Sequence, residues 1–355
     1  MWPRTNLINL LGIEHPIIQA PMGGASTPAL AIAVSNAGGL GGLGCSFMSP
    51  DELRTVANEL RSGTNRPFNL NFFAHPAPKE NPDVTAQTRA RVAPFYKELG
   101  LANVPERGKA PYDPFNEAKL SVLLDIRPKV TSFHFGLPPL DMVRALQDVG
   151  SVIICSATTV AEARMLSDAG VDAIIAQGWE AGGHRGTFDI SFEDFGVGAM
   201  ALVPQIVDAV DVPVIAAGGI ADGRGIAAAF ALGASGVQMG TAFLSCPEAN
   251  VSDAHRNELR QARDDDTRLT RAFSGRPARA KNNRYIEAMA EHRMSLPDFP
   301  TMYSFSEPLT QASANTGNSD FQFVLYGQAA ALNRELPAAE LVALLIDEAR
   351  GVLKC

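Results

Sequence analysis

Residues 212–241 read VPVIAAGGIADGRGIAAAFALGASGVQMGT. Short apolar runs at 212–219 and 235–241 each end in glycine or threonine, and a helical pattern lies between them at 222–234. The VIAA stretch of the first run is apolar without alternation, as expected of a strand that is buried on both faces. Asp222 stands where a helix N-cap is expected, and glycine follows the helical pattern. The stretch therefore predicts a strand–helix–strand unit within a parallel sheet.

The same alternation extends over most of the chain. Further apolar runs lie at 16–20, 39–44, 67–73, 129–136, 151–157 and 171–178, and capped helical patterns lie at 27–39, 49–63 and 158–170. Eight strands that alternate with helices imply a parallel sheet, and eight is the number that closes a barrel. The alternative is an open doubly wound sheet, but PMGGAS after the first run is not its G-x-G-x-x-G fingerprint. We therefore predict an α/β fold of the (β/α)8 TIM barrel class.

Two segments do not follow this alternation of strands and helices. Residues 74–120 are proline-rich and polar and then helical, which predicts an excursion between the third and fourth strands. Residues 248–317 contain DDDTRLTRAFSGRPARAKNN, which does not fit a barrel helix. We predict that 248–317 form a smaller inserted α+β domain that caps the barrel mouth, and that 1–247 together with 318–355 form the barrel.

The composition excludes several classes of function. The 355 residues are 46% hydrophobic and 19% charged with a net charge of −8, so nucleic acid and acidic membrane surfaces are unexpected partners. We find no run of about 18 apolar residues and no signal peptide. The four cysteines are widely separated, which favours reduced thiols, a cytoplasmic location and no structural zinc site. A homodimer is compatible with the sequence but is not required by it.

The glycines after the last two strands indicate a phosphate site. In a (β/α)8 barrel the chemistry lies at the carboxyl ends of the strands, and phosphate is frequently bound by the loops after strands seven and eight. Gly218, Gly219, Gly240 and Thr241 can offer backbone N–H groups there, and Thr241 adds a hydroxyl. The helix that begins near Asp222 would support the anion through its exposed N–H groups and its dipole. The alternative is that these glycines only make tight turns.

Polar residues also stand at the other strand ends. The third run carries Asn69 and Asn71, the fourth carries His134, and the sixth leads into AQGWEAGGHRGTF (176–188), where glycines surround His184. Glycine lets a backbone approach a ligand closely. Any one of these polar groups could be structural, so the prediction of a ligand site depends on their convergence at one barrel mouth.

Several stretches of the sequence resemble a known enzyme family. Six stretches resemble the FMN-dependent nitronate monooxygenases, formerly called 2-nitropropane dioxygenases: QAPMGGASTPALAIAVSNAGGLGGLG, FNLNFF, SFHFG, GWEAGGHRGTF, residues 214–243 and TRAFSGRPAR. The resemblance runs from about residue 13 to the helix that begins PAAELV. FNLNFF, SFHFG and the histidine after EAGG are more similar to the monooxygenases than to related flavin enoyl-acyl-carrier-protein reductases or NADH:quinone reductases.

This resemblance implies FMN across the barrel mouth, with its phosphate on the loops after strands seven and eight. It places Pro21 and Met22 beside the isoalloxazine, and it gives Asn69 and Gln177 hydrogen bonds to it. Gly182 and Gly183 would let the loop run close to the ring and would bring His184, the implied catalytic base, over the flavin. His134 would be a second contact to substrate or flavin.

The C-terminal region departs from the family pattern. The family often places tyrosine and lysine near the substrate; residues 299–328 offer Tyr303 and Tyr326 but no lysine, and Tyr303 is our candidate substrate contact. His15, His255 and His292 are interpreted as structural or solvated. The Asp264–Asp266 run is interpreted as a solvated face and not as a metal site.

The implied reaction is the oxidative denitrification of an alkyl nitronate by O2, which gives a carbonyl compound and nitrite. Propionate 3-nitronate is the substrate that the resemblance suggests, and a neutral nitroalkane would first have to lose its α-proton. One alternative is an FMN-dependent reductase that uses NAD(P)H to reduce a quinone or an enoyl thioester. The other is a non-catalytic barrel that binds FMN or phosphate.

Overall fold

The computed structural model describes residues 6–189 and 196–353, and its centre is an eight-stranded parallel sheet. The order of the strands in this sheet is β1-β9-β8-β6-β5-β4-β3-β2. Their bounds are β1 Ile17–Gln19, β2 Gly41–Gly44, β3 Phe68–Phe73, β4 Val130–His134, β5 Val152–Ala157, β6 Ala173–Gln177, β8 Val214–Ala217 and β9 Gly236–Met239. A parallel bridge between Ile18 and Leu40 joins the two ends of this order, so the sheet curls into a nearly closed barrel.

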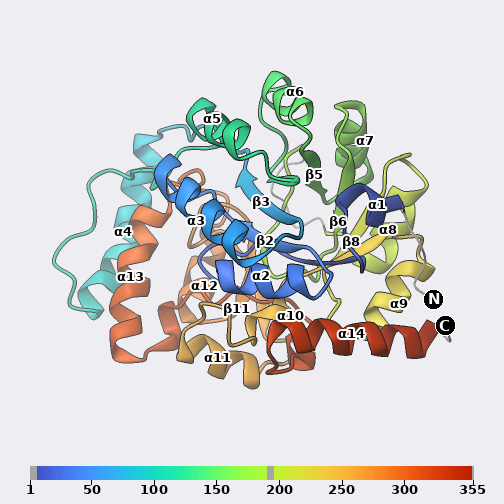
Figure 1. Cartoon of the computed structure of the whole chain (residues 1–355). Coiled ribbons are helices and arrows are strands. Elements are labelled where there is room, and N and C mark those ends of the chain that lie inside the picture. Colours follow the sequence, from blue (N-terminus) through green and yellow to red (C-terminus); the bar gives the residue numbers. More distant parts are fainter. Residues whose placement is uncertain (1–5, 190–195, 354–355) are drawn as a thin grey trace.

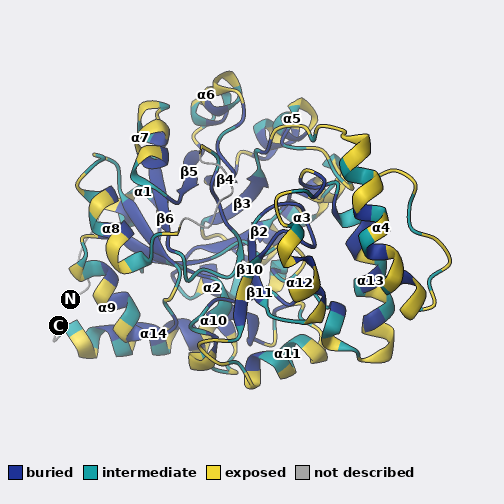
Figure 2. Ribbon diagram, turned by 180° about the vertical axis from the view of Figure 1, so that it is seen from behind, coloured by how far each residue is buried: buried dark blue, intermediate teal, exposed yellow. Residues whose placement is uncertain are grey.

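Helices surround this sheet (Figure 1). They are α1 Asn6–Leu11, α2 Pro28–Asn36, α3 Pro50–Gly63, α4 Pro82–Glu98, α5 Glu117–Ile126, α6 Leu140–Asp148, α7 Val160–Asp168, α8 Ala199–Val207, α9 Gly223–Ala231, α10 Thr241–Leu244, α11 Asp253–Arg260, α12 Arg284–Met289, α13 Tyr303–Thr316 and α14 Ala338–Leu353. Figure 2 shows buried strands inside and exposed residues on the outer faces of the helices. The predicted TIM barrel is therefore confirmed.

Local sequence signals explain where several of these helices begin. The Ser49 side chain accepts a hydrogen bond from Glu52 N, and the Glu52 carboxylate accepts one from Ser49 N, which completes a capping box on α3. Thr27 and Asp222 cap α2 and α9 in the same way, through side-chain oxygens that accept backbone N–H groups. These caps fix where each helix leaves the carboxyl end of a strand, and so they position the loops that follow β1 and β8.

A small antiparallel sheet lies beside the barrel mouth. Its order is β10-β11-β7, in which β10 is Thr267–Thr270, β11 is Ala278–Lys281 and β7 is Gly183–His184. Ala278 pairs with His184 and Arg279 pairs with Gly183. The loop after β6 is thus held by the TRAFSGRPAR segment, which lies almost ninety residues further along the chain.

A second hydrophobic core joins the excursion after β3 to the segment after β9. Val92 and Tyr96 of α4 pack with Tyr285 of α12 and with Phe305 and Leu309 of α13, and α4 and α13 lie side by side in Figure 1. The partition into a barrel and a capping domain at 248–317 stays a prediction. In the described part of the chain, we find no helix that is long and apolar enough to cross a membrane.

Candidate active site

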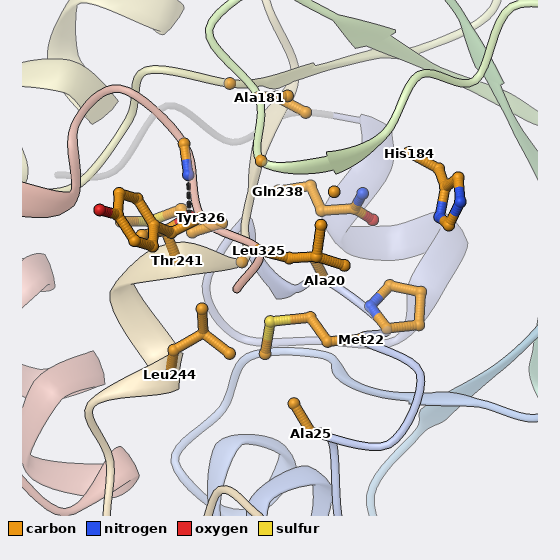
Figure 3. Close-up of a pocket in the computed structure, with 18 of the residues that line it drawn as sticks. Ala20, Met22, Ala25, Ala181, His184, Gln238, Thr241, Leu244, Leu325 and Tyr326 are labelled. Carbon is orange, nitrogen blue, oxygen red and sulfur yellow. Dashed lines mark hydrogen bonds between the residues drawn. The ribbon is translucent and has the colours of Figure 1, made fainter. Parts of the chain in front are cut away.

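A cavity of about 370 Å³ opens at the carboxyl ends of the barrel strands, within the size range of small-molecule sites. Of the residues predicted for the site, it is lined by Pro21, Met22, His134, Gln177, Gly182, Gly183, His184, Gly218, Gly219, Gly240 and Thr241. Figure 3 shows His184 and Thr241 towards opposite sides of the view, with Ala20, Met22 and Gln238 between them. We call the part around Gly218, Gly219, Gly240 and Thr241 the glycine end, and the part around His134, Gln177 and His184 the imidazole end.

The glycine end presents unused backbone donors. Within residues 6–189 and 196–353, no acceptor takes the backbone N–H of Gly218, Gly219 or Gly240. Gly218 and Gly219 have φ of +99° and +73°, a conformation in which a side chain is strained. Thr241 Oγ accepts a hydrogen bond from Gly327 N at 3.0 Å, and its hydroxyl proton can still be donated to a ligand. This arrangement suits an anion.

The helix after this loop does not contribute as the sequence suggested. Asp222 Oδ1 already accepts hydrogen bonds from Arg224 N and Gly225 N, and Gly223 N donates to Glu348 Oε2 at 3.0 Å. The first amides of α9 are therefore occupied by two carboxylates. The expectation that this helix end offers exposed N–H groups to an anion is wrong, because its own N-cap and α14 satisfy them.

At the imidazole end, the backbone of His184 is fixed by two side chains. Its carbonyl oxygen accepts from Gln177 Nε2 at 2.9 Å and from His134 Nε2 at 3.1 Å. Gln177 Oε1 also accepts from Gly186 N at 2.7 Å, so the amide predicted to face the flavin mainly holds the loop and keeps one N–H for a ligand. The role of Gln177 as a flavin contact stays a prediction.

The His184 ring is held from a different segment. Its Nε2 lies 2.9 Å from the hydroxyl oxygen of Ser274, a buried residue of the TRAFSGRPAR segment. Burial, followed by the nearby His134 and Arg276, lowers the pKa of His184 to about 3. The imidazole is therefore neutral at physiological pH, but a pKa this far below that pH also makes it a weak base, so the lowered pKa does not by itself support a role as general base.

Both nitrogens of His134 are engaged within the protein. Nδ1 lies 2.9 Å from Ser156 Oγ, and Nε2 donates to the His184 carbonyl. Burial is the main cause that lowers its pKa to about 4. His134 lines the cavity as predicted, but its hydrogen bonds position the His184 loop, and a hydrogen bond to substrate stays a prediction.

The two glycines before His184 have different reasons to be glycine. A Cβ on Gly182 would lie 2.4 Å from main-chain atoms of Tyr326 and Gly327, so Gly182 lets the C-terminal loop pass close by. Gly183 has a φ of +74° and open space where a Cβ would be. The backbone therefore turns here in a left-handed conformation just before His184.

Two predicted contacts lie outside the cavity wall. Asn69 is buried and donates to Ser132 Oγ at 2.9 Å. Asn71, two residues closer to the carboxyl end of β3, also donates to Ser132 Oγ at 2.9 Å and lines the cavity. Tyr303 packs against Phe323, which lines the cavity, and so stands one aromatic layer behind it. The predicted contacts of Asn69 with the flavin and of Tyr303 with substrate stay untested.

The structure adds residues that the sequence analysis missed. His255 of α11, interpreted from the sequence as structural or solvated, lines the cavity with a buried Nε2 that has no partner among the described residues. Asp266 is not part of a solvated face, because its Oδ2 accepts from Lys281 Nζ at 3.0 Å and from the Tyr326 hydroxyl at 3.1 Å. Gln238, Ser132 and Ser156 also line the cavity; all are polar residues on barrel strands, which was the available signal.

Comparisons with known proteins identify the family to which the sequence belongs. The family model for nitronate monooxygenase matches residues 4–348. A nitronate monooxygenase from Pseudomonas aeruginosa is 48% identical over 96% of this chain and 98% of that protein. A probable nitronate monooxygenase from Staphylococcus aureus is 37% identical over 100% of this chain and 99% of that protein.

Solved structures place the fold in the same group. A structure of nitroalkane oxidase from Streptomyces ansochromogenes has a TM-score of 0.88 at 39% identity, and the match covers 98% of this chain and 99% of that one. A structure of FabK from Thermotoga maritima has a TM-score of 0.76 at 32% identity, covering 99% and 97% of the two chains. With a family match that spans nearly the whole sequence and with the predicted motifs gathered at one barrel mouth, the chain belongs to the nitronate monooxygenase family of oxidoreductases.

Proposed function

We propose that this protein is an FMN-dependent enzyme that oxidises alkyl nitronates with O2 and gives a carbonyl compound and nitrite. The observation that carries the proposal is one cavity with backbone amides that no described residue uses at one end and a neutral imidazole at the other. The family, together with this arrangement, favours a small substrate that is oxidised beside the imidazole. Propionate 3-nitronate is the substrate we propose to test first.

The residues present fit FMN. Free N–H groups of Gly218, Gly219 and Gly240, with the Thr241 hydroxyl, would hold its phosphate. Pro21 and Met22 would border its ring system, and Gln177 would use its remaining amide hydrogen towards it. When bound, FMN would supply the redox chemistry that links oxidation of the nitronate to oxygen.

The protein would contribute position and proton transfer. A nitronate arrives without its α-proton, so the enzyme needs only to hold it and to stabilise its charge. Ser132 and the Arg276 side chain near His184 are groups that can favour an anion there. A neutral nitroalkane must first lose its α-proton, and His184 would be the base because its ring lines the cavity.

The test is aerobic turnover of propionate 3-nitronate by the FMN-loaded protein, with oxygen consumption and nitrite measured together. Chromatography of the flavin released from denatured protein identifies the cofactor. We expect FMN and stoichiometric nitrite. Release of FAD or of no flavin would contradict the cofactor assignment, and rapid oxidation of NADH without nitronate turnover would favour the reductase alternative.

A further inference from the structure

The hydroxyl of Ser274 has three polar neighbours and a single proton to share among them. Ser274 Oγ lies 2.9 Å from His184 Nε2, 3.1 Å from Arg276 O and 3.2 Å from Arg276 N. Ser274 is 1% exposed, so water does not supply a replacement partner from bulk solvent. The division of one proton and two lone pairs among these neighbours determines the state of His184.

Two of the three contacts have a fixed direction. The backbone N–H of Arg276 can only donate, and it takes one lone pair of Ser274 Oγ. The carbonyl oxygen of Arg276 can only accept, and its contact requires the hydroxyl proton. All three contacts are therefore satisfied together only if His184 Nε2 carries a hydrogen and donates it to the remaining lone pair. The opposite choice, in which Ser274 donates to His184, loses the contact to the buried Arg276 carbonyl.

We infer that Ser274 is a positioning residue that holds neutral His184 in its Nε2–H tautomer, so that Nδ1 is the basic atom of the site. Nδ1 has no hydrogen-bond partner in the part of the chain that the structure describes, and the ring lines the cavity. The inference rests on the proposed function for its chemistry. In that step the α C–H bond of a nitroalkane breaks, the proton passes to Nδ1, and the electron pair stays on the substrate as the nitronate.

The same segment also fixes the backbone of His184. It therefore determines both the position of the imidazole ring and the ring nitrogen that carries the hydrogen. Ala278 of β11 pairs with His184 in the small sheet, four residues after Ser274. His134 and Gln177 hold the carbonyl from the barrel side. A ring fixed at Cα and at Nε2 cannot flip to exchange its nitrogens without breaking a buried hydrogen bond.

The tautomer can be measured directly. Long-range ¹H–¹⁵N correlation spectra of the ¹⁵N-histidine-labelled holoenzyme distinguish the two neutral forms, and His184 is assigned by the signal missing in His184→Asn. We expect the Nε2–H form in the wild type and a mixture or the Nδ1–H form in Ser274→Ala. An Nδ1–H wild type, or a Ser274→Ala spectrum with an unchanged His184 tautomer, would overturn the inference.

Kinetics give a second readout with a matched control. Ser306 Oγ donates to Phe273 O from a buried position, so Ser306→Ala loosens the same segment without touching His184. We expect Ser274→Ala to lower kcat/KM for nitroethane by about ten- to a hundredfold, the range found when an outer partner of a metal-bound histidine is removed, while turnover of ethylnitronate changes by less than about twofold. Ser274→Thr keeps a hydroxyl and should retain the wild-type ratio of the two substrates, as should Ser306→Ala.

Equal losses on both substrates in Ser274→Ala, or the same selective loss in Ser306→Ala, would contradict a role in proton transfer. The tautomer spectrum needs no turnover. If no nitro compound were a substrate, the proposed function would fail while the spectrum would still decide the state of His184.

Discussion

His134 Nε2 donates to the backbone carbonyl of His184 at 3.1 Å, so the two histidines of the cavity are joined through main chain and not through their rings. The His134 ring is in turn fixed by Ser156 on β5. This relationship assigns different tasks to two histidines that the sequence analysis placed at the same barrel mouth. His184 presents a ring nitrogen that no described residue contacts, and His134 determines where that nitrogen lies.

The first prediction concerns His134. His134→Ala removes one of two donors to the His184 carbonyl, and we expect kcat for nitroalkanes to fall about tenfold because the base is misplaced. His134→Gln carries an amide N–H that can reach the same carbonyl, so it should retain most of the activity. Steady-state kinetics at matched FMN content check this. A raised KM with unchanged kcat in both variants would show a direct substrate contact instead.

The second prediction concerns the glycine end. Gly219→Asp adds a carboxylate to the loop that we propose binds phosphate, and repulsion between the two anions should weaken FMN binding. Gly219→Asn is the matched control, because asparagine has nearly the same shape, tolerates the φ of +73° better than most residues, and carries no charge. Equilibrium dialysis measures FMN affinity for both. Equal losses of affinity would indicate backbone strain, and equal retention would place the phosphate elsewhere.

The third prediction is a loss of stability in mild acid. Burial lowers the pKa of His75, His134 and His255 to about 4 and that of His184 to about 3, whereas an unfolded histidine titrates near 6.5. Between these values the unfolded chain binds protons that the folded chain does not, so the free energy of unfolding falls as pH falls from about 6.5 towards 4. Each histidine contributes at most about 1.4 kcal/mol per pH unit in that interval.

Urea titrations at pH 7 and pH 5 measure this effect. We expect a lower midpoint at pH 5 with an unchanged slope. His75→Phe, which removes one of these groups from a buried aromatic cluster, should reduce the difference between the two midpoints. A midpoint that is the same or higher at pH 5 would show that these histidines are protonated in the folded protein.

The fold could be predicted because its signals are local. Each buried strand is an apolar run that ends in glycine or a polar residue, and helix starts such as those at Ser49 and Asp222 are set by caps within a few residues. The barrel then follows from the number of strands and their order. The glycine loops after β8 and β9 could be placed for the same reason.

The details of the site depend on where individual side chains point, which the sequence alone does not show. Asn69 and Asn71 lie on the same face of β3, and only the one nearer the carboxyl end reaches the cavity, because two residues of strand span about 6.6 Å. His255 lies on a charged helix whose orientation is set by tertiary packing. Ser274 belongs to a motif that was noted, but its contact with His184 spans ninety residues and depends on the small sheet.

The fourth prediction separates the two tasks open to His184. A general base contributes roughly 10²–10⁴-fold, and only a substrate that still carries its α-proton needs one. His184→Asn should therefore lower turnover of nitroethane heavily and that of ethylnitronate much less. FMN content is measured in the same samples. Equal losses on both substrates would indicate an electrostatic or structural role, and no loss on either would remove His184 from the chemistry.

The central claim is that a nitronate is the electron donor to the flavin in this protein. The direct measurement is the visible absorption spectrum of the FMN-loaded enzyme after anaerobic mixing with propionate 3-nitronate, compared with anaerobic mixing with NADH. We predict that the nitronate changes the oxidised flavin spectrum within the time of turnover and that NADH leaves it unchanged. A flavin bleached rapidly by NADH and unaffected by the nitronate would contradict this account and would identify a reductase.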